Sequence, residues 1–515
     1  MCSRGACLQR RGHNGPVARS KDFPYEETKP GADFLGLDLT GVASGSLATY
    51  LAAQIREAVL DGSLPIGARL PASRTLGQDL GVSRGVVTEA YRRLADEGHV
   101  EGRGRGGTVV VSSPVQPTPA AGGRAASPIA GAETAVFSDL DGADFVDRLR
   151  AAPARIDLSP GVPDLTAFPR AAWLRAEREV LTGRSAADLG YGDPRGTAAL
   201  RTAVARWLAR SRGIRVDPDE VLVVAGVAQA FFLLAHVLRD EGVVRIGVED
   251  PGSFGARQQL RRQGADVVSV PVDDDGVRVD ALRSSGVGAV MLTPAHQFPT
   301  GVVLSGPRRR DLAGWVADGG LVVEDDYDAE HRYDRAPVPA LRGTLGEAVA
   351  YAGSVSKLLA PALRTGWLLV PPRLHARVLA LKRDVDLGNP VLGQLVLAAL
   401  MESGAMERHL RILRSRHRRR RDAMVAALAE RLPEARVQGA AAGLHLVVTL
   451  PEGIDDRAVA EEALAGGVKT HPLSLHRQRP GRPGLVLGYA ANGAGAVDDG
   501  IAVVAEAVRG VLDKT

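Results

Sequence analysis

One lysine, two serines and one arginine stand close together in an otherwise apolar stretch of the sequence. In YAGSVSKLLAPALRTGWL, Ser354 and Ser356 precede Lys357, and Arg364 follows. A lysine amine can form a Schiff base with an aldehyde, which is how pyridoxal phosphate is anchored. The hydroxyls and the forked guanidinium could bind the phosphate of that cofactor. Taken alone, a lysine beside serines is more commonly a solvated surface group.

More polar residues follow the apolar run GGLVVEDDYD. Asp325 could pair with a protonated pyridine nitrogen, and Tyr327 could donate a hydrogen bond to the ring hydroxyl. Upstream, VAGVAQAF resembles a strand that enters a helix, and the first amides of that helix could bind phosphate. EDDYD alone is equally typical of a solvated loop or a metal-like acidic cluster. The order of glycine turn, aspartate, lysine about thirty residues later and arginine is more specific than its parts.

From about residue 154 onward, short apolar runs rich in β-branched residues alternate with helical patterns. The runs are bounded by Gly, Pro or Asp, as buried strands of a mostly parallel sheet are. They are EVLVVAG, RIGVED, DVVSVPV, GAVMLTP and GGLVVEDDYD. This alternation predicts an α/β domain that places Asp325 and Tyr327 at the end of a strand.

The block between residues 43 and 112 has a different pattern. An apolar stripe with helical spacing predicts a helix near 47–60. Two short helices follow, RTLGQDL and RGVVTEAYRRLADEG, for which Ser73 and Ser83 are the predicted N-caps. The linking GV is typical of a helix-turn-helix, and VEGRGRGGTVVV predicts a strand, a glycine-rich tip and a strand, like a wing.

Arginines occupy the positions at which a helix-turn-helix with a wing contacts DNA. Arg84 begins the second short helix, and a side chain there could bind guanine in the major groove with two hydrogen bonds. Arg74 suits a phosphate or a base, and Arg103 and Arg105 at the wing tip could enter a minor groove or neutralise phosphate. The same arginines would also suit a solvated three-helix bundle, so the pattern alone leaves both interpretations open.

Composition limits the cellular setting. The chain has 515 residues, 45% of them hydrophobic, and a net charge of +4, so large cores can form and overall charge selects no partner. The only cysteines, Cys2 and Cys7, lie in the N-terminal tail, which fits a reducing cytoplasm. No apolar run is long enough for a membrane span, and the first residues lack the apolar core of a secretory signal. We expect a cytoplasmic protein without a membrane anchor.

These patterns divide the chain into four parts. We expect a disordered tail over 1–42, a winged helix over 43–112, a flexible linker over 113–153 and the α/β domain over 154–515. The linker prediction rests on SSPVQPTPAAGGRAASPIAGAE, which lacks periodicity and large apolar residues. We predict no metal site.

GARLPASRTLGQDLGVSRGVVTEAYRRLADEG, followed by GRGGT, resembles the winged helix of the GntR family of regulators over residues 46–111. The resemblance implies that this unit contacts operator DNA. Gly85 is a departure, because a hydroxyl or another polar residue is common there. With Arg105 from the wing tip, the expected DNA-contacting residues are Arg74, Ser83, Arg84, Gly85, Arg105, Gly106 and Gly107.

The rest of the chain, over residues 154–512, resembles the fold-type I aminotransferases. The matching stretches are LSPGVPDLTAFP, YGDPRGTAALRTAVARWLARSRGI, VEDPGSFGARQQL, TPAHQFPTG and GLVLGYA. With the winged helix and linker, the chain is similar to the MocR subfamily of GntR regulators. That resemblance implies pyridoxal phosphate as cofactor, an amine or amino acid as a further effector, and a head-to-tail homodimer. The implied cofactor-binding residues are Lys357, Asp325, Tyr327, Ser354, Ser356, Arg364, Ala228, Gln229 and Phe254.

Two departures from the aminotransferase pattern concern the cofactor. Val227 and Ala228 stand where hydroxyl or amide side chains often bind the phosphate, which leaves backbone amides and Gln229. Ser253 occupies the ring-stacking position, for which the neighbouring Phe254 is the alternative.

Two more departures concern the ring hydroxyl and the substrate. Phe298 replaces the asparagine that often contacts the ring hydroxyl, and His296 or Gln297 could substitute. Val486 replaces the arginine that binds a substrate α-carboxylate, so we expect transamination to be slow or absent. The arginines that could compensate are Arg257 and Arg482.

We therefore interpret the chain as a transcription regulator that responds to pyridoxal phosphate and binds double-stranded operator DNA as a homodimer. An aminotransferase with an appended DNA-binding domain is the alternative, and a regulator whose cofactor pocket is inactive is a third interpretation. The basic run RILRSRHRRRRDAM, between Arg411 and Arg421, either forms a solvated helix face or makes additional phosphate contacts with bent DNA.

Overall fold

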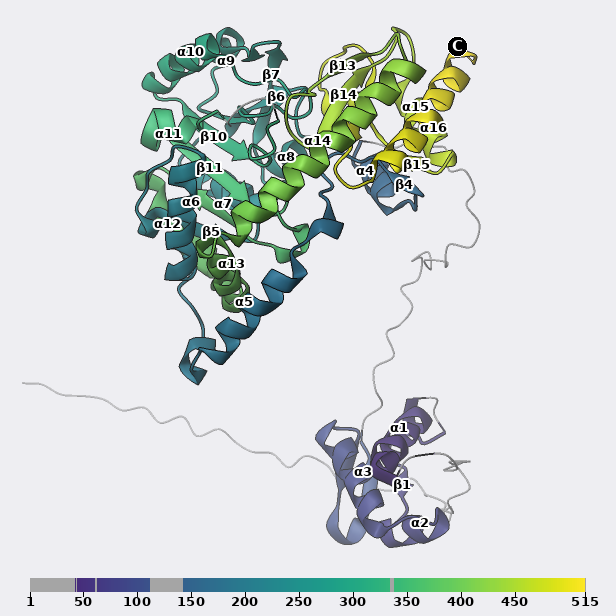
Figure 1. The fold of residues 1–515 in the computed structure, drawn as a ribbon. Helices are drawn as coiled ribbons and strands as arrows, with labels where there is room; N and C mark the ends of the chain where they lie inside the picture. Colours follow the sequence, from purple (N-terminus) through teal and green to yellow (C-terminus); the bar gives the residue numbers. More distant parts are fainter. Residues whose placement is uncertain (1–41, 43, 61–62, 112–141, 334–337, 515) are drawn as a thin grey trace, which may run out of the picture. The chain divides into compact units, whose positions relative to one another are not determined.

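The chain divides into two compact units, residues 1–131 and 132–515. The computed structural model describes residues 42, 44–60, 63–111, 142–333 and 338–514 (Figure 1). The predicted disordered tail, except residue 42, and the predicted linker up to residue 141 lie outside the described residues.

The first unit is a winged helix. Three helices are packed against a three-stranded antiparallel sheet with the strand order β1-β3-β2. The helices are α1 (Leu47–Leu60), α2 (Ser73–Asp79) and α3 (Arg84–Asp96), and the strands are β1 (Arg69–Leu70), β2 (Val100–Gly102) and β3 (Thr108–Val110). The apolar stripe of α1 packs on both of the other helices through fully buried Ile55, Leu76 and Val87, which fixes the helix-turn-helix.

The caps explain where the two short helices begin. Ser83 is the N-cap of α3, as predicted, and its Oγ accepts a hydrogen bond from the Val86 amide at 3.4 Å. The prediction for Ser73 was wrong, because α2 starts at Ser73 and its N-cap is Ala72, without a side-chain hydrogen bond. A Cβ on Gly77 would lie 3.0 Å from the Val82 carbonyl oxygen, so a glycine permits the close approach of the turn to α2.

The second unit is built on an eight-stranded sheet with the order β5-β12-β11-β10-β9-β6-β7-β8. Its strands are β5 (Leu222–Val224), β6 (Arg245–Asp250), β7 (Asp266–Asp273), β8 (Gly276–Val277), β9 (Ala289–Leu292), β10 (Leu321–Asp326), β11 (Val349–Ser354) and β12 (Gly366–Leu369). The five strands predicted from the sequence correspond to β5, β6, β7, β9 and β10. β5, β6, β9 and β10 are largely buried, which explains their continuous apolar runs, whereas β7 is mostly half-buried.

The strand directions bring six carboxyl ends to one edge. β6, β7, β9, β10 and β11 pair in parallel, whereas β12 is antiparallel to both β11 and β5. β5 therefore points the same way as β11. In open α/β sheets, ligands bind at this edge.

Helices cover both faces of the sheet (Figure 1). Those on one face are α7 (Val227–Asp240), α8 (Phe254–Arg262) and α12 (Pro372–Asp386). Those on the other face are α6 (Ala198–Ser211), α9 (Val279–Ser285), α10 (Gly306–Ala317), α11 (Leu341–Leu345), α13 (Val391–Glu402) and α14 (Ala405–Arg431). α5 (Arg170–Thr182) packs on α13.

A smaller layer follows at the C-terminus. Its antiparallel sheet has the order β13-β14-β17-β16, with β13 (Arg436–Gln438), β14 (His445–Thr449), β16 (His471–Pro472) and β17 (Gly484–Gly488). α15 (Asp456–Ala465), α16 (Ala494–Leu512) and the C-terminal half of α14 pack on it. β15 (Val468–Lys469) pairs with β4 (Ile156–Asp157), so the start of the unit is tied to its end.

Part of the predicted linker, which was expected over 113–153, is helical. The structure has a helix there, α4 (Gly142–Ala151), which packs on the second unit through buried Phe145, Val146 and Leu149. Their partners include Phe254 and Leu475, both far away in the sequence. Local composition therefore could not reveal that this segment is ordered.

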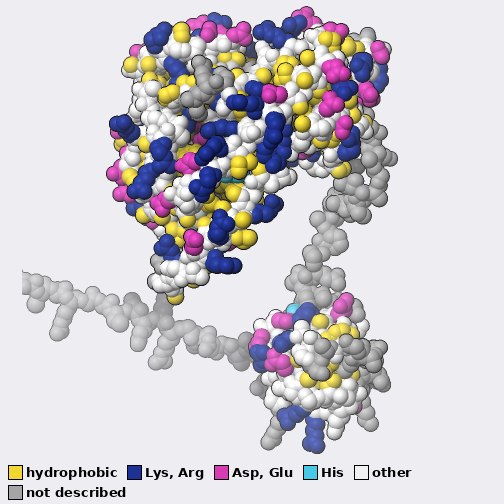
Figure 2. Space-filling view, in the orientation of Figure 1, with side chains coloured by type: hydrophobic (Ala, Val, Ile, Leu, Met, Phe, Trp, Pro, Cys, Tyr) yellow, Lys and Arg dark blue, Asp and Glu magenta, His cyan; other side chains and the backbone are white. Residues whose placement is uncertain are grey.

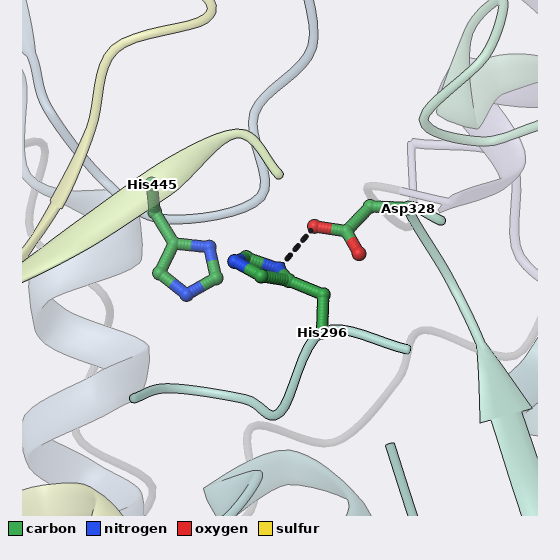
Figure 3. A group of neighbouring side chains, drawn as sticks. All are labelled: His296, Asp328 and His445. Atoms are coloured by element: carbon green, nitrogen blue, oxygen red, sulfur yellow. Dashed lines mark hydrogen bonds and ion pairs between the residues drawn. The ribbon is translucent and has the colours of Figure 1, made fainter. Parts of the chain in front are cut away.

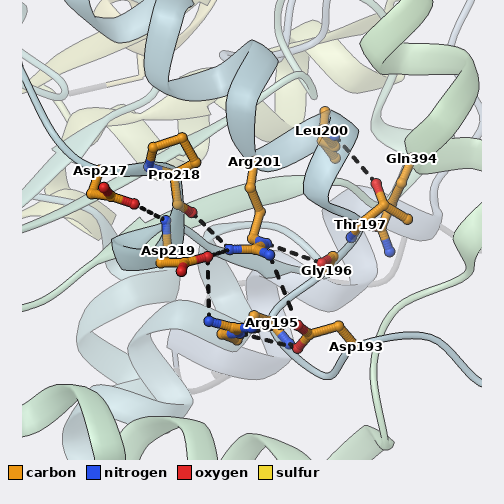
Figure 4. Close-up of polar contacts among 10 residues, drawn as sticks. All are labelled: Asp193, Arg195, Gly196, Thr197, Leu200, Arg201, Asp217, Pro218, Asp219 and Gln394. Atoms are coloured by element: carbon orange, nitrogen blue, oxygen red, sulfur yellow. Dashed lines mark hydrogen bonds and ion pairs between the residues drawn. The ribbon is translucent and has the colours of Figure 1, made fainter.

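The YGDPRG loop is fixed by a polar network between the start of α6 and β5 (Figure 4). Arg195 pairs with Asp193 at 2.7 Å, and Arg201 donates to the carbonyl oxygen of Gly196 at 3.1 Å. Gly196 has a φ of 106°, and a Cβ there would lie 2.3 Å from a methyl group of Val223. Only glycine fits this position.

No helix within the described ranges is both long and apolar enough to cross a membrane.

Candidate cofactor pocket and DNA-binding face

A cavity of about 390 Å³ lies at the carboxyl edge of the large sheet. That volume is within the range of small-molecule sites. Five strand ends contribute to its wall, from the loops after β5, β6, β9, β10 and β11. The lining residues from these loops are Val227, Ser253, Phe254, Gly255, Thr293, Phe298, Asp325, Tyr327, Ser354, Ser356 and Lys357. The structure thus brings together most of the residues predicted to bind the cofactor.

Lys357 lies in the loop after β11 and points into this cavity. Its Nζ donates a hydrogen bond to the carbonyl oxygen of Gly161, a residue on the opposite wall. Burial lowers the pKa of the Lys357 amine, and the carboxylates of Asp328 and Asp325 oppose that shift. An amine with a lowered pKa is more often neutral, and therefore nucleophilic.

Asp325 ends β10 beside this amine. Its Oδ1 is buried and has no hydrogen-bond partner among the described residues. Burial and the neighbouring carboxylates of Asp326 and Asp328 raise the pKa of Asp325 to about 8. Such an unpaired carboxyl oxygen fits a protonated ring nitrogen, which would supply both the missing hydrogen bond and a compensating charge.

Tyr327 lies between the cavity and a buried polar cluster. Its hydroxyl donates to the His296 carbonyl at 3.2 Å and lies 3.1 Å from His296 Nδ1. His296 Nδ1 also lies 2.9 Å from Asp328 Oδ2. His296 therefore supports Tyr327 from behind and does not line the cavity itself.

His296, Asp328 and His445 form the one group, within the described part of the chain, with three possible metal-ligand atoms close enough to share an ion (Figure 3). These atoms lie within 4.8 Å of one another. The site is crowded, because a Cβ on Gly443 would lie 2.0 Å from His296 Cε1 and 2.8 Å from Asp328 Oδ2. The hydrogen bond between His296 Nδ1 and Asp328 Oδ2 joins two members of this group, whereas His296 Nε2 and His445 Nδ1 are buried without a hydrogen-bond partner among the described residues.

The phosphate end of the predicted site is formed by Gly226 and Arg364. Gly226 has a φ of 90° and precedes α7, whose first amides have no partner within the helix. A Cβ on Gly226 would lie 3.5 Å from both Nη atoms of Arg364. Arg364 itself has a φ of 47°, which is uncommon outside glycine and is found at binding sites.

Other predicted residues of this end are engaged differently. The Gln229 side chain accepts from the Ala225 amide at 2.7 Å and donates to Asp386 at 2.7 Å, so it braces α7 against α12. Ala228 does not line the cavity, and its carbonyl accepts from Gln259. Ser354 Oγ accepts from the Ser356 amide at 3.4 Å, which orders the turn before Lys357. Cofactor contact by Ala228 or Gln229 stays a prediction.

Phe254 and α4 form the remaining wall. Ser253 caps α8 by accepting from the Ala256 amide at 3.3 Å, so its hydroxyl is already used. The Phe254 ring lines the cavity and also packs against α4, from which Val146 and Arg150 line the same cavity. α4, Gly161, His471 and His476 also line the cavity, and none of them was predicted from the sequence as part of the site.

The absence of a substrate-binding arginine has a structural counterpart. Val486 is fully buried in β17, where it packs with Val447 and Leu473. Neither possible substitute lines the cavity: Arg257 donates to the Leu475 carbonyl at 2.9 Å, and Arg482 pairs with Glu452 at 3.4 Å.

Most of the predicted DNA-contacting residues are exposed on the winged helix. Arg74, Ser83, Arg84 and Gly85 are all exposed. Other arginines of this unit are engaged internally: Arg92 pairs with Glu89 and Asp96, and Arg56 pairs with Glu97. The described residues give Arg74 and Arg84 no such side-chain partner, so both guanidinium groups are available to a ligand.

The wing is a tight turn between β2 and β3. Gly107 has a φ of 77°, and a Cβ on it would lie 3.3 Å from Arg69 Nε. Arg69, from β1, therefore lies against Gly106 and Gly107 and is a DNA-contact candidate that the sequence analysis missed. The Arg105 side chain lies outside the described atoms.

The basic run lies on α14, and most of its arginines have internal partners. Arg414 donates to the Glu330 carbonyl at 2.7 Å and Arg421 to the Ala440 carbonyl at 2.7 Å. Arg416 and Arg420 pair with buried Asp164 at 2.7 and 2.9 Å. These contacts favour the structural interpretation of the run, although exposed basic side chains remain on this face of the unit (Figure 2).

Comparison with known families agrees with both units. The family of bacterial regulatory proteins named gntR matches residues 47–110, and the family of class I and II aminotransferases matches residues 154–468. The structure is similar to the multiple substrate aminotransferase of Thermococcus profundus, with a TM-score of 0.67 and 29% identity over 75% of this chain and 98% of that one. It is also similar to the α-aminoadipate aminotransferase LysN of Thermus thermophilus, solved with N-(5'-phosphopyridoxyl)-L-leucine, with a TM-score of 0.65 and 27% identity over 73% and 96%.

Two curated relatives match both units. The chain is 32% identical to the probable rhizopine catabolism regulatory protein MocR of Rhizobium meliloti, over 87% of this chain and 91% of that protein. It is 32% identical to the HTH-type pyridoxine biosynthesis transcriptional regulator PdxR of Corynebacterium glutamicum, over 90% and 96%.

Fold and site together define a DNA-binding winged helix fused to an aminotransferase-type domain. The chain belongs to the GntR family of bacterial transcription regulators. It is of the MocR type, in which the winged helix is joined to a class I and II aminotransferase domain. The predicted family, fold class and regulatory function are confirmed over the alternative of an aminotransferase with an appended domain.

Proposed function

We propose that this regulator binds pyridoxal phosphate in the cavity at the sheet edge and that occupancy of the cavity alters its binding to operator DNA. The observation that supports this most directly is the pairing of two groups in one cavity. Lys357 offers a partly buried amine, and Asp325 offers a buried carboxyl oxygen without a partner. A pyridine ring with an aldehyde and a ring nitrogen satisfies both groups at once.

Each residue then has a defined task. When bound, pyridoxal phosphate supplies an electrophilic aldehyde carbon and a ring that withdraws electrons. Asp325 would accept the hydrogen bond of the ring N–H, and the Tyr327 hydroxyl, which donates to the His296 carbonyl here, would donate to the ring hydroxyl instead. Arg364 and the first amides of α7 hold the phosphate, with Ser354 and Ser356 beside them. Phe254 lies against the ring and excludes water from it.

The winged helix is the proposed operator-reading unit. α3 enters the major groove with Arg84 at its N-terminus, and Arg74 and the wing, including Arg105, Gly106 and Gly107, contact the backbone or the minor groove. Gly85 and Ser83 lie at the same helix end and let the backbone approach the DNA closely. A protein with this role binds double-stranded operator DNA and is located in the cytoplasm.

The second unit is proposed to form a homodimer. Leu174 and Leu181 on α5 are 63% and 50% exposed, and Tyr191 is 94% exposed. Tyr191 lines a groove of about 700 Å³ that is formed by residues 189–193 and 386–392. Large apolar side chains that are exposed together mark an interface, and a second copy of the chain is the occupant we propose.

The absorption spectrum of the full-length protein with pyridoxal phosphate tests this function. We expect a band near the border of the ultraviolet and visible ranges, and borohydride should then leave a permanent label on the peptide that contains Lys357. Lys357→Ala should show neither. Equal labelling of both proteins would mean that the amine assignment is wrong, and absence of any band in the wild type would contradict the cofactor.

A further inference from the structure

One wall of the cavity comes from the segment that joins the two units. Val146 and Arg150 on α4 line the cavity, and α4 is the first described element after the stretch that connects to the winged helix. Phe145, Val146 and Leu149 attach this helix to Phe254 and Leu475 in a small apolar cluster of its own. α4 therefore touches the ligand site on one side and continues directly into the interdomain chain on the other.

The charges of the cavity wall are few. Among its described lining residues, the only lysine or arginine side chains are Lys357 and Arg150. Burial lowers the pKa of His471 to about 4 and of His476 to about 3, so both imidazoles are neutral at physiological pH. Arg150 is thus the one arginine among the described lining residues of the cavity, and it lies on α4.

The Arg150 guanidinium is available to a ligand. Its side chain is 75% exposed, and the ion pair it makes with Asp147 spans a loose 3.6 Å. Its backbone is held more firmly, because the Arg150 carbonyl accepts a hydrogen bond from Lys469 at 3.3 Å. The helix is therefore fixed at this point while the side chain can turn toward the cavity. Buried Val486 offers no competing cation.

We propose that Arg150 binds the anionic group of an effector whose primary amine replaces the Lys357 amine on the aldehyde-derived carbon of the cofactor. The double bond from that carbon to the Lys357 nitrogen is exchanged for one to the effector nitrogen, and the two protons that the effector amine loses pass to Lys357, which leaves as a free amine. The effector class is then an amine that also bears a carboxylate or sulfonate, and the anion is recognised from α4 rather than from β17. This inference rests on the proposed function. Since Arg150 belongs to α4, an effector held at both ends stabilises the docked position of α4 and so acts on the chain that leads to the DNA-binding unit.

Matched pairs of ligands and variants test the proposal. The cofactor-loaded full-length protein is titrated with glycine, β-alanine, 4-aminobutanoate and the common α-amino acids. Each is compared with the alkylamine that lacks its carboxylate, and the change in the cofactor spectrum is followed. Arg150→Gln is compared with Arg148→Gln, an exposed residue of the same helix that does not line the cavity.

We expect at least one acid to bind the wild type and Arg148→Gln with equal affinity. Arg150→Gln should bind that acid about 10-fold more weakly, while the corresponding alkylamine binds all three proteins equally. Hydrogen exchange of the α4 peptide should slow on addition of the acid in the wild type and not in Arg150→Gln.

The outcomes separate this inference from the proposed function. If the wild type shows a cofactor band but Arg150→Gln binds the acid as tightly as the wild type does, the role of Arg150 is wrong while the proposed function stands. The same conclusion follows if the wild type binds alkylamines as tightly as acids. A cofactor-loaded wild type whose spectrum changes with none of the acids also contradicts the role of Arg150. A wild type without a cofactor band overturns the proposed function and this inference together.

Discussion

The amine of Lys357 donates a hydrogen bond to the carbonyl of Gly161, a residue that lies 196 positions earlier in the chain. Gly161 follows β4, which pairs with β15, so the N-terminal segment of the unit closes over the amine. A Cβ on Gly161 would lie 3.1 Å from Nζ, and its φ of 77° belongs to the left-handed region. Close approach and backbone conformation both favour glycine here.

Gly161→Ala should therefore weaken cofactor binding beyond its effect on stability. The methyl group would displace the amine from the carbonyl oxygen. Gly453→Ala is the matched control, because Gly453 has a φ of 91° and nothing within 4 Å of a Cβ. A left-handed alanine costs roughly 1–2 kcal/mol in both variants. Equal cofactor dissociation constants for the two variants, measured by absorbance titration, would show that Gly161 has no role at the site.

Asp325→Asn should weaken the cofactor and change how stability depends on pH. The pKa of Asp325 is raised in the folded protein to about 8 by burial and by the neighbouring carboxylates, whereas an unfolded aspartate has its ordinary pKa of 3.8. The unfolded state therefore loses its proton first, and stability without cofactor falls as pH rises between these two values. An asparagine at position 325 cannot ionise, so the variant does not lose this stability as the pH rises.

Without cofactor, the Asp325→Asn variant should consequently be more stable than the wild type at pH 8, by more than about 1 kcal/mol, and the difference should shrink toward pH 4. Denaturant unfolding across this range measures it. Identical pH profiles, with unchanged cofactor affinity, would mean that Asp325 is an ordinary solvated acid.

Arg84→Ala should weaken operator binding and relax its sequence preference. A good bidentate base contact contributes roughly 1–3 kcal/mol. Arg92→Ala is the control, because Arg92 lies on the same helix but is already paired with Glu89 and Asp96. The cofactor spectrum should stay unchanged in both. Binding is measured at fixed salt, and operator affinity that is unaffected by Arg84→Ala would contradict the proposed docking of α3.

Leu174→Glu combined with Leu181→Glu should dissociate the proposed homodimer. The two residues lie on one face of α5 and are largely exposed, so new charges would be tolerated by the isolated chain but not by an apolar interface. Sedimentation should show a monomer and operator affinity should fall. Ile412→Glu on α14, 56% exposed, is the control and should remain dimeric. A wild type that sediments as a monomer would exclude the interface.

Sustained transamination of common α-amino acids should be slow or absent. Val486 is buried in β17 where a carboxylate-binding arginine is expected, and poor positioning of a substrate can cost a factor of about 100 or more in rate. A panel of amino acids with a keto-acid acceptor, followed by product analysis, measures this. Turnover on the order of 1 s⁻¹ or faster would be that of an enzyme and would contradict the prediction.

Much of the site could be predicted because its chemistry is local. Lys357 and Asp325 follow apolar runs that are long enough to be recognised as buried strands, and strand ends meet at one edge of a parallel sheet. The helix-turn-helix is equally local, since the Ser83 cap, the turn and the apolar stripe all lie within about seventy residues, although the cap of α2 is Ala72 and not Ser73. Such patterns depend on neighbours in the sequence, so the sequence by itself determined them.

The tertiary structure alone decided which residues share the cavity. Gln229 was predicted from its position in a glycine turn, yet its amide pairs with Asp386 on α12. α4 was predicted as linker because its apolar residues find their partners, Phe254 and Leu475, more than a hundred positions away. A helix of ten residues is marginal without such packing, so its order, and the place of Arg150 at the cavity, follow from contacts that no local pattern records.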